Sequence, residues 1–598
     1  MIGNVVGIDA DLILVNLNKE ALKLSNLVGY YVIIENESTK LVGEITSIKN
    51  NLALITLMGE LDNGKFVFGL IHKPSFTSVV KMINEEDVSS LLSISDYNES
   101  KHLYLGKSFL YPNVDVGVEL NAFFNKHFAI FGSTGSGKSC SVARIMQNLF
   151  ANRNTIPYNA SIFIFDAYGE YHPAFSHLHD LHPDVHFKTY TTNFNDPILV
   201  FNPKEENNNA LLNIPIWLLD VDDIAILLGA DNVSQMPIIE NALKLVNVFV
   251  RNEDEVIKHK NDIIARALLD ILSSGKTPSQ IRDQIFSVLS HFNTKELNLD
   301  STISQPGYSR TLKQCFLIDD TGKIREMELI TKFFQNFISE DLKFDLPDGT
   351  YRYTLEDLEN AFDFAMISAG TLNSVKAYEE LSRLKVNLHN LVNNEYSKFF
   401  DREEYISRDN YIRSLLSTRE GGKVQIVNFK INYVDDRFAK AITKIYSKLL
   451  FNYAKNLDNR GMYPFHIILE EAHRYVQNDG DVKVLGYNIF ERITKEGRKY
   501  GVILGLISQR PSELSETVVS QCSNFLVFKI LHPKDVDYIK DMVPNITSDI
   551  VKKLKIINPG TCVAFGTAFK IPVIVKFALP DPRPSSDNCD ISNTWFNN

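Results

Sequence analysis

The first part of the chain consists of short apolar runs separated by polar turns. β-Branched and aromatic residues dominate three of these runs, at residues 28–34, 41–48 and 52–57. Short strands at this close spacing are typical of a small barrel. We therefore expect an N-terminal β-barrel over residues 1–85, and a linker with one or two short elements over residues 86–120.

From about residue 121 the pattern changes to buried strands that alternate with helices. An apolar run at residues 128–131 precedes a helix expected at 140–150, and a second run at 161–166 ends in Asp166. This order of strand, helix and strand predicts a parallel sheet. The same pattern returns after residue 420, where we expect further strands at residues 423–429, 465–470, 501–507 and 524–529.

The segment between these two stretches has helical periodicity instead. Apolar residues share one helical face at positions 264, 268, 271 and 272, and again at positions 281, 285, 288 and 289. Such stripes indicate a packed helical core rather than a cofactor site. We therefore predict an α/β chain in which a helical insertion, residues 205–420, divides the core into residues 121–204 and 421–575. Residues 576–598 are expected to form an extended tail.

The run at 128–131 leads into Gly132–Ser139, which matches the phosphate-loop pattern G-x-x-x-x-G-K-[ST] without a mismatch. Glycines let the backbone curl so that successive N–H groups point at phosphate oxygens. In this pattern Lys138 contacts the β- and γ-phosphates, and the Ser139 hydroxyl ligates Mg²⁺. A chance turn is the less favoured alternative, because a strand precedes the loop and a helix follows it. We predict that ATP with Mg²⁺ binds to Gly132, Ser133, Thr134, Gly135, Ser136, Gly137, Lys138, Ser139 and Cys140.

Phosphate-loop enzymes also need a carboxylate strand that holds Mg²⁺ and polarises the attacking water. The run at 465–469 delivers Glu470 and Glu471 at its carboxyl end, which is where ligands bind in open α/β sheets. We assign Glu470 to the metal and Glu471 to the general base. The alternative is an acidic pair on the surface.

The strand expected at 501–507 is preceded by Arg498 and followed by Gln509. Gln509 is expected to sense the γ-phosphate or to orient water. Arg498 lies at the opposite end of the strand, where an arginine finger for a neighbouring subunit's nucleotide and an ordinary surface residue are equally supported. For the segment D-A-Y-G-E-Y, residues 166–171, a role beside the nucleotide and a purely structural role are likewise equally supported.

Length and composition narrow the class of protein. A chain of 598 residues is too long for one core, so several domains are expected. A net charge of −11 argues against a protein that coats nucleic acid with its whole surface, but not against a local basic channel. Five scattered cysteines fit a reducing compartment and predict no zinc site. The chain lacks a run of membrane-spanning length and a signal peptide, so we expect it in the cytoplasm.

Taken together, these motifs resemble those of the HerA branch of the HerA/FtsK superfamily of hexameric DNA-pumping ATPases. The phosphate loop, D-A-Y-G-E-Y, L-E-E-A-H-R and E-G-R-K-Y-G…S-Q-R-P follow the order and spacing of the HerA motifs. The second motif departs from the family, in which a Pro-His pair often fills the middle. The resemblance covers nearly the whole chain. It implies a RecA-like P-loop ATPase core with an N-terminal HAS-barrel-like domain, a helical insertion and a C-terminal brace.

The resemblance also implies an activity and partners. It implies an ATP-dependent double-stranded DNA translocase that forms a homo-hexamer, passes DNA through a central pore and works with a separate effector. That effector is a NurA-type nuclease in DNA-end processing, or a sirtuin-type NADase or another nuclease in antiviral defence. The alternative is a ring-shaped ATPase scaffold that regulates such an effector with little pumping. The family's roles fall, as assigned above, on Lys138, Ser139, Glu470, Glu471, Gln509 and Arg498.

DNA contacts in such a ring are expected on loops that face the pore. One candidate is the polar loop at residues 477–483, directly after the acidic strand. Another is the region around Lys430 and Arg437.

Overall fold

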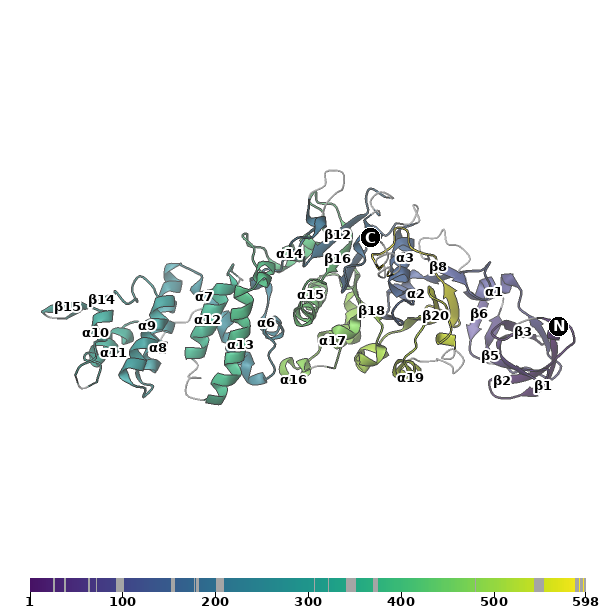
Figure 1. Cartoon of the computed structure of the whole chain (residues 1–598), viewed down its shortest axis with the longest axis horizontal. Helices are drawn as coiled ribbons and strands as arrows, with labels where there is room; N and C mark the ends of the chain where they lie inside the picture. The colour runs from purple at the N-terminus through teal and green to yellow at the C-terminus, as the bar shows by residue number, and fades with distance from the viewer. Residues whose placement is uncertain are drawn as a thin grey trace. The chain divides into compact units, whose positions relative to one another are not determined.

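The structure is a computed structural model of the chain (Figure 1). It describes residues 1–24, 27–36, 39–62, 65–70, 72–92, 102–151, 156–176, 178, 182–200, 209–305, 307–320, 322–339, 351–368, 375–478, 480–542, 553–586, 591 and 595. The chain divides into two compact units. Unit 1 comprises Met1–Leu211, Ile412–Asn478 and Asn488–Asn598, and unit 2 comprises Leu212–Tyr411 and Asp479–Tyr487.

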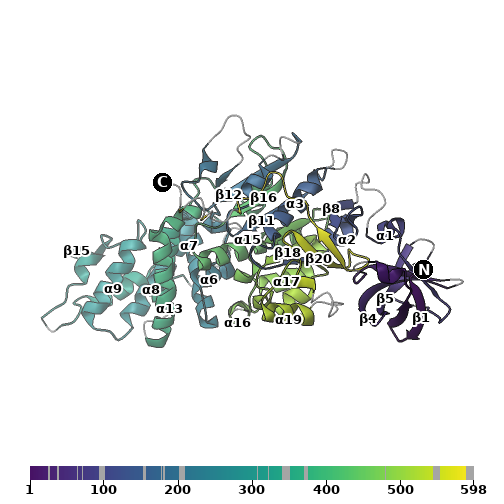
Figure 2. The same cartoon turned by 45° about the vertical axis from the view of Figure 1, so that its right-hand side comes forward.

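Unit 1 begins with a closed β-barrel, which Figures 1 and 2 show around the N-terminus. Its strands pair in the order β2 (Leu12–Leu17), β1 (Gly3–Ile8), β7 (Val79–Met82), β3 (Tyr31–Glu35), β4 (Lys40–Lys49) and β5 (Leu52–Asp62). Pairing of β2 with β5 closes the barrel, and β6 (Lys65–Phe68) extends from β5. Alternate residues of β2, such as Ile13 and Val15, point into an apolar interior. The predicted barrel is confirmed.

The rest of unit 1 is built on one large sheet. Its strand order is β13 (Ala210–Leu211), β12 (His186–Thr191), β16 (Val424–Lys430), β11 (Ser161–Asp166), β17 (Phe465–Leu469), β18 (Val502–Ser508), β10 (Phe128–Phe131), β19 (Asn524–Val527), β20 (Thr561–Gly566), β21 (Val573–Lys576), β8 (His102–Ser108) and β9 (Asp115–Glu119). The strands from β13 to β19 are parallel, and those from β20 onward pair antiparallel. The predicted parallel core is therefore confirmed. The range expected as a linker contains α1 (Glu85–Leu92), β8 and β9.

Helices cover both faces of the parallel strands. On β11, Ile162 and Ile164 belong to the apolar cluster that includes α3 (Lys138–Phe150). The alternate residue Phe165 lies on the other face, where its ring centroid is 6.4 Å from that of Tyr446 on α15 (Asp436–Asn456). This period of two explains why the strands are apolar throughout: a parallel strand is buried on both faces.

Unit 2 is mainly helical, as predicted for the insertion. Its longer helices are α6 (Val221–Leu228), α7 (Met236–Phe249), α8 (Asp254–Leu272), α9 (Pro278–His291), α11 (Met327–Gln335), α12 (Leu355–Ser368) and α13 (Val375–Asn393). A hairpin of β14 (Thr302–Gln305) and β15 (Tyr308–Thr311) accompanies them. Of the two predicted stripes, all residues are buried except Leu272, which is half-buried. The stripes are therefore core, as expected.

Shorter helices complete the two units. They are α2 (Leu120–Phe124), α4 (His172–Phe175), α10 (Leu312–Cys315), α14 (Arg408–Leu415), α16 (Asp481–Leu485), α17 (Ile489–Glu496), α18 (Glu516–Ser520) and α19 (Pro533–Met542). In the described part of the chain, no helix has the length and apolar character that a membrane span requires.

The barrel and the C-terminal tail are both attached to the core of unit 1. The Tyr31 backbone N–H donates to the Tyr111 hydroxyl at 2.9 Å, and the Tyr31 hydroxyl donates to the Pro572 carbonyl at 3.1 Å. The tail lies along α3. There the Gln147 side chain accepts from the Asp581 N–H at 3.0 Å and donates to the Pro582 carbonyl at 2.9 Å. The part of the predicted tail around Asp581 and Pro582 is thus held on α3.

Candidate nucleotide site

The phosphate loop connects β10 to α3 and is fixed by the neighbouring strands. The Gly132 N–H donates to the Ser508 carbonyl at 3.2 Å, and the Ser133 N–H donates to the Lys529 carbonyl at 2.8 Å. Gly137 has a φ of +93°, and a Cβ there would lie 2.7 Å from the Gly560 nitrogen. Only glycine fits this position, because the backbone is left-handed and closely approached. The loop therefore has the curled geometry that the sequence predicted.

Two side chains of the loop are suited to an anion. Lys138 is 9% exposed, and its Nζ donates to the Ser133 carbonyl at 3.1 Å. Burial lowers the pKa of Lys138, while the acidic groups of Glu471, Glu470 and Glu170 act in the opposite direction. The Ser136 hydroxyl is buried and has no hydrogen-bond partner among the described residues. A phosphate would satisfy both groups.

The two acids at the end of β17 occupy different environments. Glu470 is 3% and Glu471 is 6% exposed. Burial raises the pKa of Glu470 well above its ordinary value, and Asp166 and Glu170 raise it further. Burial also raises the pKa of Glu471, but Lys138 opposes this shift. Lys138 therefore lies near both acids, and the pKa of Glu470 is raised further by the carboxylates around it.

The backbone at Glu471 separates the two side chains. Its φ is +48°, an uncommon conformation for a residue with a Cβ. The preceding residue, Glu470, is still held in register with the sheet, because its N–H donates to the Phe165 carbonyl at 3.1 Å. Strained backbone of this kind is found at functional sites, where the surrounding structure enforces it.

Gln509 and His473 complete the side of the site nearest Glu471. Gln509 follows β18, and its Oε1 accepts from the Thr134 hydroxyl of the phosphate loop at 2.5 Å. The Nδ1 of His473 lies 3.2 Å from the Ser508 hydroxyl and 3.2 Å from Glu471 Oε2. Sequence reasoning missed His473, although its place two residues after Glu471 was a usable signal. Burial lowers the pKa of His473, so the neutral ring is favoured beside the acid.

The segment at residues 166–171 contains one structural acid and one acid that faces the site. Asp166 is fully buried, and its carboxylate accepts from the N–H groups of Gly169, Glu170 and Tyr171 at 2.8–3.0 Å. Asp166 therefore holds a turn. The Glu170 carboxyl group lies near the Ser139 hydroxyl, which lowers its pKa, although burial raises that pKa more strongly.

The structure does not bring Arg498 to the phosphate loop of its own chain. Arg498 lies in the short 3₁₀ helix Gly497–Tyr500, before β18, whereas Gln509 follows the same strand. Its charge contributes to lowering the pKa of His127, which precedes β10, although burial of His127 is the larger cause. Arg498 therefore lies toward the amino ends of the parallel strands. The remaining loop residue, Cys140, is half-buried, with its Sγ 4.0 Å from the Ser586 hydroxyl.

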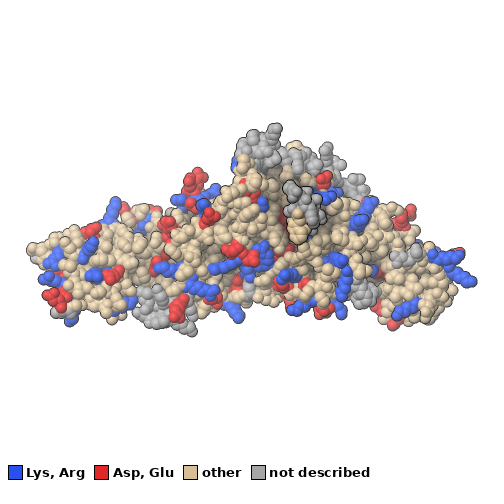
Figure 3. Space-filling model, viewed as in Figure 1, with Lys and Arg blue, Asp and Glu red and all other residues tan. Residues whose placement is uncertain are grey.

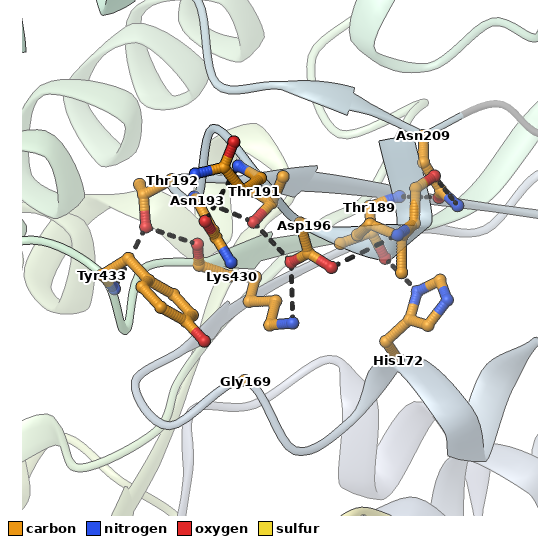
Figure 4. Close-up of polar contacts among 12 residues, drawn as sticks. Gly169, His172, Thr189, Thr191, Thr192, Asn193, Asp196, Asn209, Lys430 and Tyr433 are labelled. Atoms are coloured by element: carbon orange, nitrogen blue, oxygen red, sulfur yellow. Dashed lines mark hydrogen bonds and ion pairs between the residues drawn. The ribbon is translucent and has the colours of Figure 1, made fainter. Parts of the chain in front are cut away.

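Lys430, a candidate DNA contact, is engaged inside the protein (Figure 4). Its Nζ lies 2.8 Å from Asp196 Oδ2, and the Thr191 hydroxyl donates to the same oxygen at 2.8 Å. Asp196 is 4% exposed. Because a paired, largely buried lysine is not available to a DNA phosphate, the role suggested for Lys430 is not supported. In the other candidate, the loop at 477–483, residue 479 lies outside the described residues.

The residues present fit a Mg²⁺ ion that is shared with a nucleotide. One carboxylate oxygen in each of Glu170 and Glu470 is buried without a hydrogen-bond partner among the described residues, and Glu471 Oε2 is buried beside the His473 ring. Within the same residues, no group of three His, Cys, Asp or Glu side chains is placed to hold a metal by itself. Mg²⁺ typically binds to one or two protein groups together with water and substrate phosphates. The protein groups at this site supply only part of the coordination shell of Mg²⁺, and phosphate and water would supply the rest.

Comparison with known proteins identifies relatives. Residues 103–450 match the family model described as helicase HerA, central domain. The chain is 24% identical over 598 residues to a DNA double-strand break repair helicase HerA of Sulfolobus acidocaldarius, with 95% of this chain and 92% of the relative covered. It is also 24% identical over 537 residues to a protein of the same name from Pyrococcus furiosus, with 88% and 77% covered.

Solved structures that resemble the chain include VirB4 of Thermoanaerobacter pseudethanolicus. The TM-score is 0.39 and the identity 12%, with 81% of this chain and 98% of that chain covered. The plasmid coupling protein TrwB in complex with ADP and Mg²⁺ has a TM-score of 0.39 and an identity of 11%, with 78% and 87% covered.

Substitutions of the phosphate-loop lysine and of the acid after β17 are expected to have different effects. Lys138→Ala is expected to abolish ATP binding, because no other loop residue places a cation at the phosphates. Glu471→Gln is expected to bind ATP and to hydrolyse it at least about 100-fold more slowly, because the general base is lost. Filter binding and single-turnover hydrolysis measure the two effects. Wild-type hydrolysis by Glu471→Gln would reject Glu471 as the base.

Proposed function

This chain belongs to the HerA helicase family, and on that premise we propose that it is an ATP-driven translocase of double-stranded DNA. Membership confirms the resemblance seen in the sequence, and the chain is an ATPase of this family. The observation that carries the proposal is the meeting of Lys138, Glu471 and Gln509 at the carboxyl ends of β10, β17 and β18. Lys138 supplies a positive charge for the phosphates, and Glu471 supplies the general base. Gln509 connects the end of β18 to the phosphate loop. Mg²⁺, when bound with ATP, supplies charge neutralisation at the transferred phosphate.

The mixture of positive and negative residues on the surface and the ion pair between Lys430 and Asp196 favour a second candidate function. On the face shown in Figure 3, Lys and Arg are interspersed with Asp and Glu. The net charge is −11, and Lys430 is paired with Asp196. These observations support the alternative of a ring-shaped scaffold whose ATPase regulates an effector with little DNA pumping.

Stimulation by DNA separates the two functions. For a translocase, saturating double-stranded DNA is expected to raise the steady-state ATPase rate several-fold, because DNA movement and hydrolysis are coupled. The measurement is repeated at rising salt, since phosphate contacts weaken as counterions compete. Glu471→Gln serves as the blank for contaminating ATPase. An unchanged rate at low salt would favour the scaffold instead.

We also propose that the chain works as a homo-hexamer, in which Arg498 serves the nucleotide of a neighbouring subunit. Its support is the position of Arg498 at the opposite end of β18 from Gln509. In that position it cannot serve its own phosphate loop. In the proposed ring, the amino ends of the parallel strands in one subunit would lie near the carboxyl ends of the strands in the next subunit. An arginine finger that acts in trans needs this arrangement.

Mixing of inactive subunits tests the trans role. Arg498→Ala is expected to lower hydrolysis by about 10³-fold, and Lys138→Ala is expected to be inactive as well. Mixed rings should regain part of the activity, because some interfaces combine an intact loop with an intact arginine. Lys499→Ala, a change at the neighbouring basic residue, is the matched control and should hydrolyse normally. Failure of every mixing ratio would contradict the trans role.

The effector is proposed to dock on the barrel. This effector is a NurA-type nuclease, another nuclease or a sirtuin-type NADase, and the reduced cysteines fit work in the cytoplasm. The barrel lacks the nucleotide motifs, and it exposes large apolar side chains, among them Phe76 at 65% and Leu24 at 53%. Because Tyr31 packs into the core cluster, deletion of residues 1–85 would damage the core.

Surface substitution is therefore the sharper test of docking. Phe76→Asp is expected to weaken effector capture in a pull-down by at least about tenfold, since a buried charge opposes association. Basal ATPase should not change, because Phe76 lies outside the nucleotide site. Val386→Asp, at a residue of unit 2 that is 56% exposed, is the control. Full-strength capture by Phe76→Asp together with loss by the control would move the docking surface to unit 2.

A further inference from the structure

We propose that Glu170 is a further residue of the Mg²⁺ site, positioning the water shell of the ion beside Ser139. The inference rests on the proposed ATPase function of the site, and it adds Glu170 to the acid Glu470 that is assigned to the metal. Four observations carry it: a rigid turn, the neighbours of Glu170, buried carboxylate oxygens without a partner, and a second anchor from the C-terminal tail.

The turn that presents Glu170 is fixed by its own hydrogen bonds. Asp166 Oδ1 accepts from the N–H of Gly169 at 2.8 Å and from that of Glu170 at 3.0 Å, and Oδ2 accepts from Tyr171 at 3.0 Å. Gly169 has a φ of +74°, and a Cβ there would lie 2.6 Å from Lys430 Cε. The left-handed φ favours glycine at this position. The backbone N–H of Glu170 is therefore held at the end of β11 by Asp166.

The surroundings of Glu170 include a hydroxyl group of the phosphate loop. Glu170 lies near the Ser139 hydroxyl and the Lys138 ammonium group as well as near other acids. Glu470 also lies near Lys138 and near the acids Asp166, Glu170 and Glu471. Ser139 is the loop residue whose hydroxyl binds Mg²⁺ in this motif. Glu170 is thus the acid placed beside the hydroxyl that binds the ion.

Buried and unpaired oxygens show that a ligand is still needed there. Glu470 is 3% exposed, and its Oε2 has no hydrogen-bond partner within the described residues. Glu170 Oε2 is also buried without a hydrogen-bond partner within the described residues. Unpaired carboxylate oxygens in a buried site are costly unless a cation or water contacts them. A hydrated Mg²⁺ held between Ser139 and Glu170 would satisfy these atoms.

A second anchor holds the turn from the outside. The Ser585 N–H donates to the Glu170 carbonyl at 2.9 Å. The tail is itself fixed to α3 through Gln147 and Asp581, at 3.0 Å. Glu170 therefore receives restraint from both the sheet and the tail. A residue so held is pre-organised for metal binding in the way that ligand-orienting residues usually are.

The test compares three variants that each remove one carboxylate charge. They are Glu170→Gln, Glu470→Gln and Glu119→Gln, the last at an exposed residue at the end of β9. Binding of a fluorescent ATP analogue to the full-length ring is measured in EDTA and across a Mg²⁺ titration. Glu170→Gln is expected to raise the Mg²⁺ concentration at half-saturation by about tenfold to a hundredfold. Its affinity in EDTA should match that of the wild type, and Glu119→Gln should match it in both conditions.

Two further outcomes decide the assignment. An unchanged Mg²⁺ requirement in Glu170→Gln, with a raised one in Glu470→Gln, would overturn it. Equal losses with and without Mg²⁺ would overturn it too, since they indicate damage to the phosphate loop. Glu170→Asp, which keeps the charge on a shorter side chain, should recover part of the Mg²⁺ affinity. Failure of the wild type to bind ATP at all would reject the proposed function itself, so the two failures remain distinguishable.

Discussion

The desolvation of charge at the carboxyl ends of the parallel strands is the constraint on which the site depends. Glu470 and Glu471 are almost fully buried, and Lys138 is the cation that faces them. Carboxylates brought together in a low-dielectric site repel one another and cannot all stay ionised at ordinary cost. The raised pKa of Glu470 and of Glu471 expresses that cost. A magnesium–nucleotide complex would offset this cost, so the burial of these carboxylates favours binding of the ligand.

The strand order converts motifs that are distant in sequence into one site. β10, β18, β17 and β11 are consecutive in the sheet, although insertions separate them along the chain. Because all four run parallel, the phosphate loop, Gln509, Glu471 and Glu170 all follow strands at the same edge. The main segment of the helical unit, Leu212–Tyr411, can therefore be long, since along the chain it lies between β13 and β16, outside these four strands.

Short sequence patterns predicted those parts of the fold that depend on residues close together in the chain. The phosphate loop, the acid pair after β17 and the strand at 161–166 follow from short motifs and apolar runs, and the structure has them as expected. The joining of β8 and β9 to the large sheet was not predictable, because β8 joins it through β21, which lies more than 450 residues away. Lys430 shows the same limit. Its charge suggested a surface role, but its ion pair with Asp196 depends on the pairing of β12 with β16.

The individual roles of Glu170 and His473 could not be assigned from the sequence for a related reason. Each is an ordinary polar residue in its own stretch of sequence, and each gains its role only from the residues of another strand. Ser139 lies near one, and Ser508 contacts the other. A sequence motif reveals a side chain that acts with its chain neighbours more readily than one that acts across a sheet.

The attachment of the barrel has a mechanical consequence. From the phosphate-loop strand β10, paired strands continue without interruption through β19, β20 and β21 to β8. Beyond them, Tyr31 hydrogen bonds to Tyr111 and to Pro572, and Lys553 pairs with Glu44. Deforming these paired strands would require many backbone hydrogen bonds to break together. The connection between the nucleotide site and the barrel therefore resists deformation. Under the proposed translocase function, a displacement at the nucleotide site would reach the barrel through these paired strands.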